Sequence, residues 1–295
     1  MVNRLSILRP RSTAEATRLL ADLGQDARVV AGATAITLLL RQQLIAPRWL
    51  VSLGGIVDSN LDSISVDERG LHIGALVRHR EVEKSAVVQA GWRVLAEAFG
   101  SVANVRIRNA ATVGGVLAEA DYASDPPAVL VALEAEVLVS GPSGDRLIPA
   151  GDFFRGFFET ALGPDEIVTG VRVPTQGASA SAGSVYEKYR SRSSEDRPCV
   201  GVAAVVRLAD DTRTCDDLRV VVGAASEKPE RLPEAEAIAR GQPLAADVAT
   251  AVADAYAAGI DTLSDLRGSA WYRTEMIRVW VRRAILHAVE RAGAA

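Results

Sequence analysis

The chain has very little cysteine and histidine. It holds two cysteines, Cys199 and Cys215, and three histidines among its 295 residues. An iron–sulfur cluster or a structural zinc ion needs about four such ligands. The cysteines form no C-x-x-C pair, and the histidines show no ligand spacing. We therefore expect no metal site in this chain, and we expect both cysteines to be buried, reduced thiols.

Long apolar runs and a strong charge bias are also missing. The first residues, MVNRLSILRPRS, contain no apolar stretch of signal-peptide length, and no run approaches a transmembrane span. The net charge is −4 with 24% charged residues, so nothing favours binding to nucleic acid or to an anionic membrane. These absences predict a cytoplasmic protein that does not insert into membranes.

Three common signatures of nucleotide binding or hydrolysis do not occur. No G-x-G-x-x-G follows a strand, no P-loop pattern is present, and no G-x-S-x-G occurs. The sequence therefore does not support a Rossmann domain, a P-loop enzyme or an α/β-hydrolase.

Periodicity predicts the local elements of the first 176 residues. Ser12 to Glu15 is a capping-box pattern that begins a helix, and Gly24 ends that helix. The other expected elements are strands at 28–31, 49–53, 71–75 and 167–173, helices at 34–42 and 80–99, and a hairpin at 134–140 and 146–149. The first strand–helix–strand run predicts a parallel pair with a right-handed crossover.

A stretch rich in Gly, Ala and Ser, 175–184, predicts a linker between domains at 1–176 and 177–295. Beyond it lie β-like runs at 185–191, 199–209 and 218–224, then helical patterns at 233–240, 245–258 and 269–291. We expect an α+β fold in which a two-part first domain, with small mixed sheets and helices, precedes a three-stranded antiparallel sheet backed by helices. A group of phenylalanines, Phe153, Phe154, Phe157 and Phe158, favours a plug in the core or between domains over stacking on a cofactor.

Two turns carry small residues between apolar elements. Ala31-Gly32-Ala33-Thr34 follows a β-like run and opens a helical pattern, and Thr112-Val113-Gly114-Gly115 lies at the centre of 105–132. Glycine lets a ligand or another backbone come close, and a helix start offers backbone N–H groups to a phosphate or pyrophosphate. Each turn alone is also typical of an ordinary strand-to-helix connection.

Together the turns resemble a known family, the FAD-binding (medium) subunits of molybdenum hydroxylases in the carbon monoxide dehydrogenase and xanthine dehydrogenase superfamily. The resemblance rests on Ala31 to Thr34 and on the run Ile107 to Val116, with Asp121 and Asp125 following in place. Weaker similarities extend over nearly the whole chain, at 73–75, 153–156, 164–174, 186–188, 265–267 and 272–273. Two residues depart from the family pattern, which has a second glycine at Ala33 and an asparagine at Val116.

This resemblance implies an FAD-carrying electron-transfer subunit with a two-part FAD-binding domain and no catalytic residue of its own. A large subunit would hold the molybdopterin cofactor, a small subunit would hold two [2Fe–2S] clusters, and the complex would be a dimer of heterotrimers. The implied FAD contacts are Ala31, Gly32, Ala33, Thr34, Ala35, Ile107, Thr112, Val113, Gly114, Gly115, Ala120, Asp121, Ser124, Asp125 and Lys188.

The resemblance also implies roles for these residues. Backbone N–H groups and hydroxyls of 32–34 and 112–115 would cradle the pyrophosphate and ribityl chain, and Asp125 would accept from a ribityl or adenine-side donor. Lys188 would approach the flavin ring, although a solvated lysine on a strand face is an equal alternative. Arg106 and Arg108 would belong to a docking surface for a partner or would form ion pairs with Asp121 or Glu119. A flavin-free scaffold subunit and a stand-alone flavin oxidase stay open as alternative functions.

Overall fold

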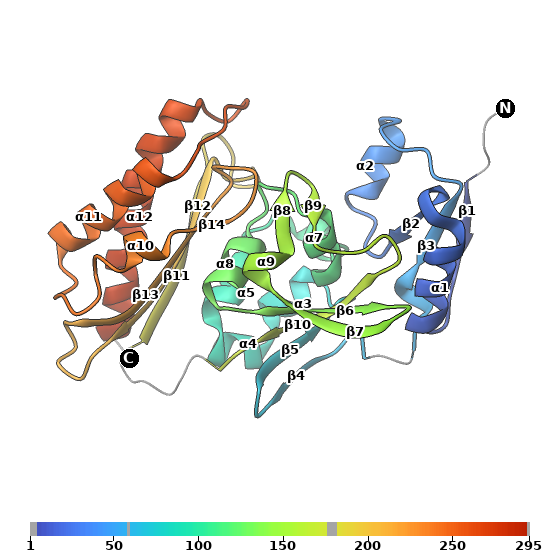
Figure 1. The fold of residues 1–295 in the computed structure, drawn as a ribbon, viewed down its shortest axis with the longest axis horizontal. Helices are drawn as coiled ribbons and strands as arrows, with labels where there is room; N and C mark the ends of the chain where they lie inside the picture. Colours follow the sequence, from blue (N-terminus) through green and yellow to red (C-terminus); the bar gives the residue numbers. More distant parts are fainter. Residues whose placement is uncertain (1–4, 58–59, 176–181, 294–295) are drawn as a thin grey trace.

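The computed structural model describes residues 5–57, 60–175 and 182–293, and Figure 1 shows three parts arranged in a row. The expected linker at 175–184 and the expected domain boundary after residue 176 fall mostly outside the described residues. None of the described helices is both long enough and apolar enough to cross a membrane.

The N-terminal part is a small parallel sheet covered by a helix. Its strands β1 (Ser6–Leu8), β3 (Trp49–Ser52) and β2 (Ala27–Val30) lie in that order, and the parallel pairing predicted for β2 and β3 is confirmed. Helix α1 (Thr13–Leu23) begins as expected, since the Ser12 hydroxyl accepts a hydrogen bond from the Glu15 N–H, and it ends at Gly24 with φ 53°. The 3₁₀ turns Gly24–Asp26 and Leu53–Gly55 and helix α2 (Ile36–Arg41) complete this part.

The central part is a five-stranded antiparallel sheet with helices on it. The strand order is β4 (Ile64–Asp67), β5 (Gly70–Gly74), β10 (Ile167–Val173), β6 (Glu136–Gly141) and β7 (Gly144–Pro149). The predicted hairpin is β6–β7, and the predicted helical region 80–99 consists of α3 (His79–Lys84), α4 (Ala86–Gly91) and α5 (Arg93–Gly100). A second short hairpin pairs β8 (Phe154–Gly156) with β9 (Glu159–Thr160), directly after α9 (Ala150–Phe153).

The segment 105–132, which was expected to carry a turn between apolar elements at its centre, is mostly helical. It contains α6 (Val105–Arg108) and α7 (Val113–Glu119), and after Asp125 the chain enters α8 (Pro126–Ala132). All seven residues of α8 are buried, because the helix lies between the central part and strands β12 and β13 of the last part. Of the four phenylalanines, Phe153 and Phe154 are in the core as expected, whereas Phe157 and Phe158 are exposed.

The C-terminal part confirms the predicted meander with its helical layer. Strands β11 (Ala182–Tyr189), β12 (Val200–Leu208) and β13 (Cys215–Gly223) pair in sequence order, and a fourth, two-residue strand, β14 (Glu230–Arg231), extends the expected three. Helix α12 (Ala270–Gly293) packs on β11 and β12, and α11 (Ala246–Gly259) packs on α12 (Figure 1). Helix α10 (Pro233–Glu236) is short, and both cysteines are buried in this core, as predicted.

A candidate cofactor site where two glycine turns meet

The two glycine-bearing turns are in direct contact. A Cβ atom at Gly32 would lie 2.0 Å from the carbonyl oxygen of Ala110 and 3.1 Å from the Cα of Ala111. No side chain fits into that space, so glycine at position 32 is what lets the first turn approach the second. The structure therefore brings together the residues predicted at 31–35 and at 107–115, which lie far apart in the sequence.

The first turn presents a row of unused backbone donors. The N–H groups of Gly32, Ala33, Thr34 and Ala35 make no hydrogen bond to any described residue. The turn is held from its other side, where the Thr37 hydroxyl donates to the carbonyl oxygen of Ala33 at 2.6 Å. Ala33 has a φ of 60°, so it keeps the left-handed conformation that glycine adopts most easily. These four N–H groups can bind an anion such as a pyrophosphate.

The second turn differs from the expectation in its donors. Thr112 is the N-cap of α7, and its hydroxyl oxygen accepts from the Gly115 N–H at 3.1 Å. The N–H groups of Val113 and Gly114 donate to the carbonyl oxygens of Val77 and Ala75, at 2.9 and 2.8 Å. The N–H groups of Val113, Gly114 and Gly115 thus already have acceptors within the chain, and the predicted contact of this turn with FAD stays a prediction.

Gly114 itself has a packing role in this arrangement. A Cβ there would lie 2.7 Å from the Cβ of Ala75 and 3.0 Å from its carbonyl oxygen. The glycine is buried and faces the protein's own backbone. Gly115, by contrast, is exposed at the first turn of α7. Gly114 therefore allows the start of α7 to lie close against the end of β5.

His79 holds the second turn through two hydrogen bonds, and the sequence analysis did not identify this residue. Its backbone N–H donates to the carbonyl oxygen of Ala111 at 3.0 Å, and its ring Nε2 lies 3.2 Å from the carbonyl oxygen of Thr112. A carbonyl only accepts, so Nε2 carries the proton and Nδ1 is bare. Nδ1 is buried without a partner, and burial lowers the pKa of His79 to about 4. At neutral pH the uncharged ring therefore holds the Thr112 carbonyl, and the backbone N–H of His79 holds the Ala111 carbonyl.

Asp125 and Lys188, both predicted to face FAD, bind each other. The Lys188 ammonium donates to Asp125 Oδ2 at 2.8 Å and to the carbonyl oxygen of Ser101 at 2.9 Å, and Tyr186 donates to Asp125 Oδ1 at 2.7 Å. The two charged side chains are 3% and 4% exposed. Both oxygens of Asp125 already accept hydrogen bonds within the chain, and its predicted acceptance from FAD stays a prediction. Two of the three ammonium hydrogens are used, so contact of the third with FAD stays a prediction.

The rest of the segment 120–125 also faces the last part of the chain. Arg197 pairs with Asp121 at 2.6 Å, and the Tyr122 hydroxyl donates to Asp265 at 2.7 Å. Ala120 is buried with φ 46°, and Ser124 is half-buried. Asp121 and Tyr122 thus connect two parts of the molecule, and the predicted contacts of Ala120, Asp121 and Ser124 with FAD stay predictions.

The two arginines before the glycine pair behave differently from each other. Arg108 donates to Glu83 at 3.0 Å and to the carbonyl oxygens of Val102 and Ala103. The alternative pairing of the arginines with Asp121 or Glu119 is therefore wrong for Arg108, because its partner lies on α3. Arg106 is exposed and makes no ion pair with a described residue, whereas Arg108 pairs with Glu83.

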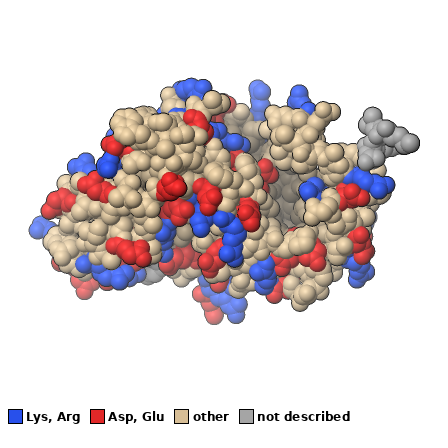
Figure 2. Space-filling view, turned by 45° about the horizontal axis from the view of Figure 1, so that its top comes forward, with Lys and Arg blue, Asp and Glu red and all other residues tan. Residues whose placement is uncertain are grey.

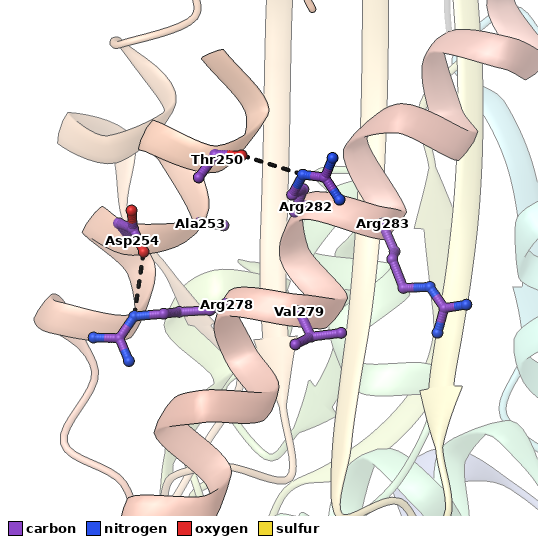
Figure 3. A pocket seen from close by; sticks show the side chains of 7 residues that line it. All are labelled: Thr250, Ala253, Asp254, Arg278, Val279, Arg282 and Arg283. Atoms are coloured by element: carbon purple, nitrogen blue, oxygen red, sulfur yellow. Dashed lines mark hydrogen bonds and ion pairs between the residues drawn. The ribbon is translucent and has the colours of Figure 1, made fainter. Parts of the chain in front are cut away.

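A separate groove lies between α11 and α12, far from both turns in the sequence. Figure 3 shows its lining side chains: Thr250, Ala253, Asp254, Arg278, Val279, Arg282 and Arg283. Arg278 pairs with Asp254 at 3.2 Å, and Arg282 donates to the Thr250 hydroxyl at 3.1 Å. These contacts fasten one helix to the other, so the groove is a feature of helix packing. Among the described residues, no group of three or more His, Cys, Asp or Glu is placed to hold a metal ion.

Comparison with known proteins connects this geometry to a family. Residues 3–176 match the family described as "FAD binding domain in molybdopterin dehydrogenase", and residues 184–288 match "CO dehydrogenase flavoprotein C-terminal domain". The chain is 33% identical to the alpha subunit of the 6-hydroxypseudooxynicotine dehydrogenase complex of Paenarthrobacter nicotinovorans, over 95% of this chain and 93% of the relative. It is 31% identical to the carbon monoxide dehydrogenase medium chain of Hydrogenophaga pseudoflava, over 94% of each chain.

Solved structures agree with the sequence comparison. A chain of carbon monoxide dehydrogenase from Hydrogenophaga pseudoflava superposes with a TM-score of 0.93, at 32% identity and with 99% of each chain covered. A chain of quinoline 2-oxidoreductase from Pseudomonas putida 86 gives a TM-score of 0.91 at 28% identity, also with 99% of each chain covered. The protein therefore belongs to the family of FAD-binding subunits of molybdenum hydroxylases, as an oxidoreductase subunit of the carbon monoxide dehydrogenase medium-chain type.

Proposed function

We propose that this chain binds FAD at the meeting point of the two turns, takes electrons from a [2Fe–2S] subunit and passes them to an external acceptor. The observation that carries the proposal is the row of four unused N–H groups at 32–35, placed against the second turn by the contact of Gly32 with Ala110. A dinucleotide has a doubly charged pyrophosphate that needs such donors. The residues present thus fit the cofactor that the family binds.

The two departures from the family pattern do not remove this fit. Ala33 adopts φ 60°, so the turn keeps its left-handed residue at a cost of about 1 kcal/mol or more. Val116 is partly buried and packs on the hydrophobic core of the central part. The substitution of asparagine by valine there therefore contributes to packing, and the turn itself is intact. The flavin-free scaffold is the weaker alternative for this reason.

Each residue of the site has a proposed task. The N–H groups of 32–35 would hold the pyrophosphate, and the Thr112 hydroxyl, whose oxygen accepts from Gly115, has its own hydrogen left to donate. His79 would keep the second turn in place, and the third ammonium hydrogen of Lys188 would donate to the cofactor. When bound, FAD supplies the redox chemistry, and the protein supplies binding and orientation.

The same proposal includes the partners. The chain has two cysteines and both are buried, so an iron–sulfur cluster that serves this subunit must belong to another chain. Relatives carry the names "medium chain" and "complex subunit alpha", which describe parts of larger assemblies. We infer a molybdopterin-binding large subunit, a small subunit with two [2Fe–2S] clusters, a dimer of heterotrimers as the assembly and a cytoplasmic location.

The test is the FAD content of the purified complex and of one matched pair of variants. The wild-type complex should release about one non-covalent FAD per copy of this chain on denaturation. Gly32→Ala adds a methyl group where the Ala110 oxygen stands, so it should separate the turns and strongly reduce FAD content. Gly91→Ala is the control, because a Cβ there meets nothing within 4 Å, and its FAD content should equal that of the wild type. A wild-type complex without FAD would favour the scaffold, and full occupancy in Gly32→Ala would place the cofactor elsewhere.

A further inference from the structure

Three residues other than glycine adopt left-handed backbone conformations at the segment 120–125, which joins α7 to α8. Ala120 has φ 46°, Phe158 has φ 55° and Ala224 has φ 63°. The Phe158 N–H donates to the carbonyl oxygen of Ala120 at 3.2 Å, and the Ala224 N–H donates to that of Tyr122 at 3.1 Å. Side chains disfavour this conformation, so it persists only where surrounding contacts impose it. The β8–β9 hairpin and the residue after β13 therefore hold the segment in a defined place.

The Tyr122 side chain adds a link to the C-terminal part. Its ring packs edge to face on Phe157, with the ring centroids 5.3 Å apart, and its hydroxyl donates to Asp265 Oδ2 at 2.7 Å. Asp265 begins the turn 265–268 ahead of α12, where its N–H donates to the carbonyl oxygen of Gly268 at 3.0 Å. Tyr122 is thus held between a hairpin of the central part and a turn of the C-terminal part.

Asp265 is a firmly anchored acceptor. The Arg273 side chain, which is 0% exposed, donates to Asp265 Oδ1 at 2.7 Å and to three backbone carbonyl oxygens of the C-terminal part. Arg267 donates to Oδ1 through its backbone N–H at 2.7 Å and to Oδ2 through its guanidinium at 2.8 Å. Burial alone would raise the pKa of Asp265, but the hydrogen bonds from Arg273, the Arg267 N–H and Tyr122 hold that pKa well below its ordinary value. Asp265 therefore offers Tyr122 a charged acceptor whose place the C-terminal part fixes.

A tight turn connects Tyr122 to the buried ion pair. Within this turn, the side chain and the carbonyl oxygen of Asp121 accept from the N–H groups of residues 123 and 124, at 3.0 and 2.9 Å. Asp125 comes next and binds Lys188 at 2.8 Å. Because the turn is closed by its own hydrogen bonds, a displacement of Tyr122 also moves Asp125, and Lys188 with it.

These contacts connect the candidate site to the far end of the row of three parts. Gly32 of the N-terminal part touches Ala110 of the central part. Figure 2 shows the surface hollowed between these two parts, with the N-terminal part on the right and the C-terminal part on the left. Asp265 and Arg273 belong to the C-terminal part, so they act on the site through the segment 120–125.

We propose that Tyr122 and Asp265 are positioning residues, which hold the segment 120–125, and through Asp125 also Lys188, in the place that the cofactor requires. The proposal rests on the function proposed above, which expects FAD to contact this segment and Lys188. A positive charge near a flavin favours its reduced, more negative form, so the place of Lys188 affects the reduction potential as well as binding. The C-terminal part thereby governs how tightly FAD is held and how readily it accepts electrons.

The experiment compares the wild-type complex with Tyr122→Phe. Phenylalanine keeps the ring against Phe157 and removes the hydroxyl, while Asp265 keeps its hydrogen bonds from Arg267 and Arg273. The dissociation constant of FAD should rise about tenfold, because binding must then order a segment that the fold no longer holds. The reduction potential of bound FAD should become more negative, and the free energy of unfolding should fall only modestly.

Tyr256→Phe on α11 is the matched control. The Tyr256 hydroxyl donates to the carbonyl oxygen of Val220 at 2.6 Å and accepts from the Leu232 N–H at 3.1 Å, inside the hydrophobic core of the C-terminal part. The control removes the same chemical group from a buried network that makes no contact with 120–125. It should lose at least as much stability as Tyr122→Phe and keep the FAD affinity and the reduction potential of the wild type.

Two results would overturn the positioning role. One is a Tyr122→Phe complex whose FAD affinity and reduction potential equal those of the wild type. The other is a loss of FAD affinity that follows the loss of stability in both variants, since the contact with Asp265 would then serve the fold in general. A wild-type complex that binds no FAD would contradict the proposed function and this proposal together, whereas normal FAD binding in both the wild type and Tyr122→Phe would contradict the positioning role alone.

Discussion

His79 couples the stability of the glycine turn to pH. Its ring donates to Thr112 through Nε2 and has a buried, unpartnered Nδ1, so protonation would create a buried donor without an acceptor. Burial lowers its pKa in the folded protein from 6.5 to about 4. The unfolded chain therefore binds this proton first as the pH falls, and the folded state loses stability between pH 6.5 and 4.

The expected loss from this residue is up to about 3 kcal/mol of unfolding free energy. His79→Gln removes the titration while keeping an amide that can donate to the Thr112 carbonyl. Chemical denaturation of both proteins from pH 7 to 4.5 should show the wild type losing stability relative to the variant as the pH falls. A difference between the two that is constant over this range would mean that the His79 ring titrates normally.

At the scale of elements, β11 and the start of α8 are joined by a buried ion pair. Lys188 on β11 and Asp125 before α8 are almost completely buried, and Tyr186 completes the group. Burial raises the pKa of Asp125 and lowers the pKa of Lys188, while their attraction opposes both shifts. The contact at 2.8 Å with further hydrogen bonds on both sides favours the charged pair.

Removing one partner of this ion pair should lower the free energy of unfolding more than removing both partners. Lys188→Met leaves a buried carboxylate and should lower the unfolding free energy by about 3–5 kcal/mol, and adding Asp125→Asn should restore a large part of it. Arg207→Met is the control, because Arg207 pairs with Asp216 at 2.6 Å on an exposed surface and its loss should cost at most about 1 kcal/mol. Equal losses in Lys188→Met and in the double variant, measured by denaturant titration, would contradict the prediction, because removing the charge of Asp125 would then restore no stability.

At the scale of the whole molecule, three parts in a row hold one candidate cofactor site, and the residues that the structure describes include no group of three or more His, Cys, Asp or Glu placed to hold a metal ion. The N-terminal part supplies the first turn, and the central part supplies the second. The C-terminal part fixes the segment 120–125 through Arg197, Asp265 and Lys188. A subunit built this way positions a cofactor, and the proposed electron source lies in another chain.

The isolated chain should therefore bind FAD and oxidise no organic substrate. Activity should appear only after reconstitution with both partner subunits, because the proposed function assigns the substrate site and the clusters to those subunits. The measurement is steady-state oxidation of candidate purines, N-heteroaromatics, aldehydes and carbon monoxide, with an artificial electron acceptor, by the FAD-loaded chain and by the complex. Turnover by the chain alone would replace the electron-transfer role with that of a stand-alone oxidase.

The sequence by itself determined the features that depend on neighbouring residues. The cap of α1 at Ser12, the β6–β7 hairpin, the meander of β11 to β13 and the burial of both cysteines followed from local patterns. The family resemblance was equally visible, because Ala31 to Thr34 and Ile107 to Val116 are contiguous runs. Short elements such as β14 were missed, since two residues carry no periodic signal.

Only the tertiary structure decided which hydrogen-bonding and charged groups of the site already have a partner within the protein. The N–H groups of Val113 and Gly114 bind carbonyls of 75 and 77, Asp125 binds Lys188, and Arg108 binds Glu83. Each partner lies tens of residues away, and no local pattern encodes such a pairing. A hydrogen-bonding group is available to a ligand only if the fold has not satisfied it, and that depends on which distant segments pack together.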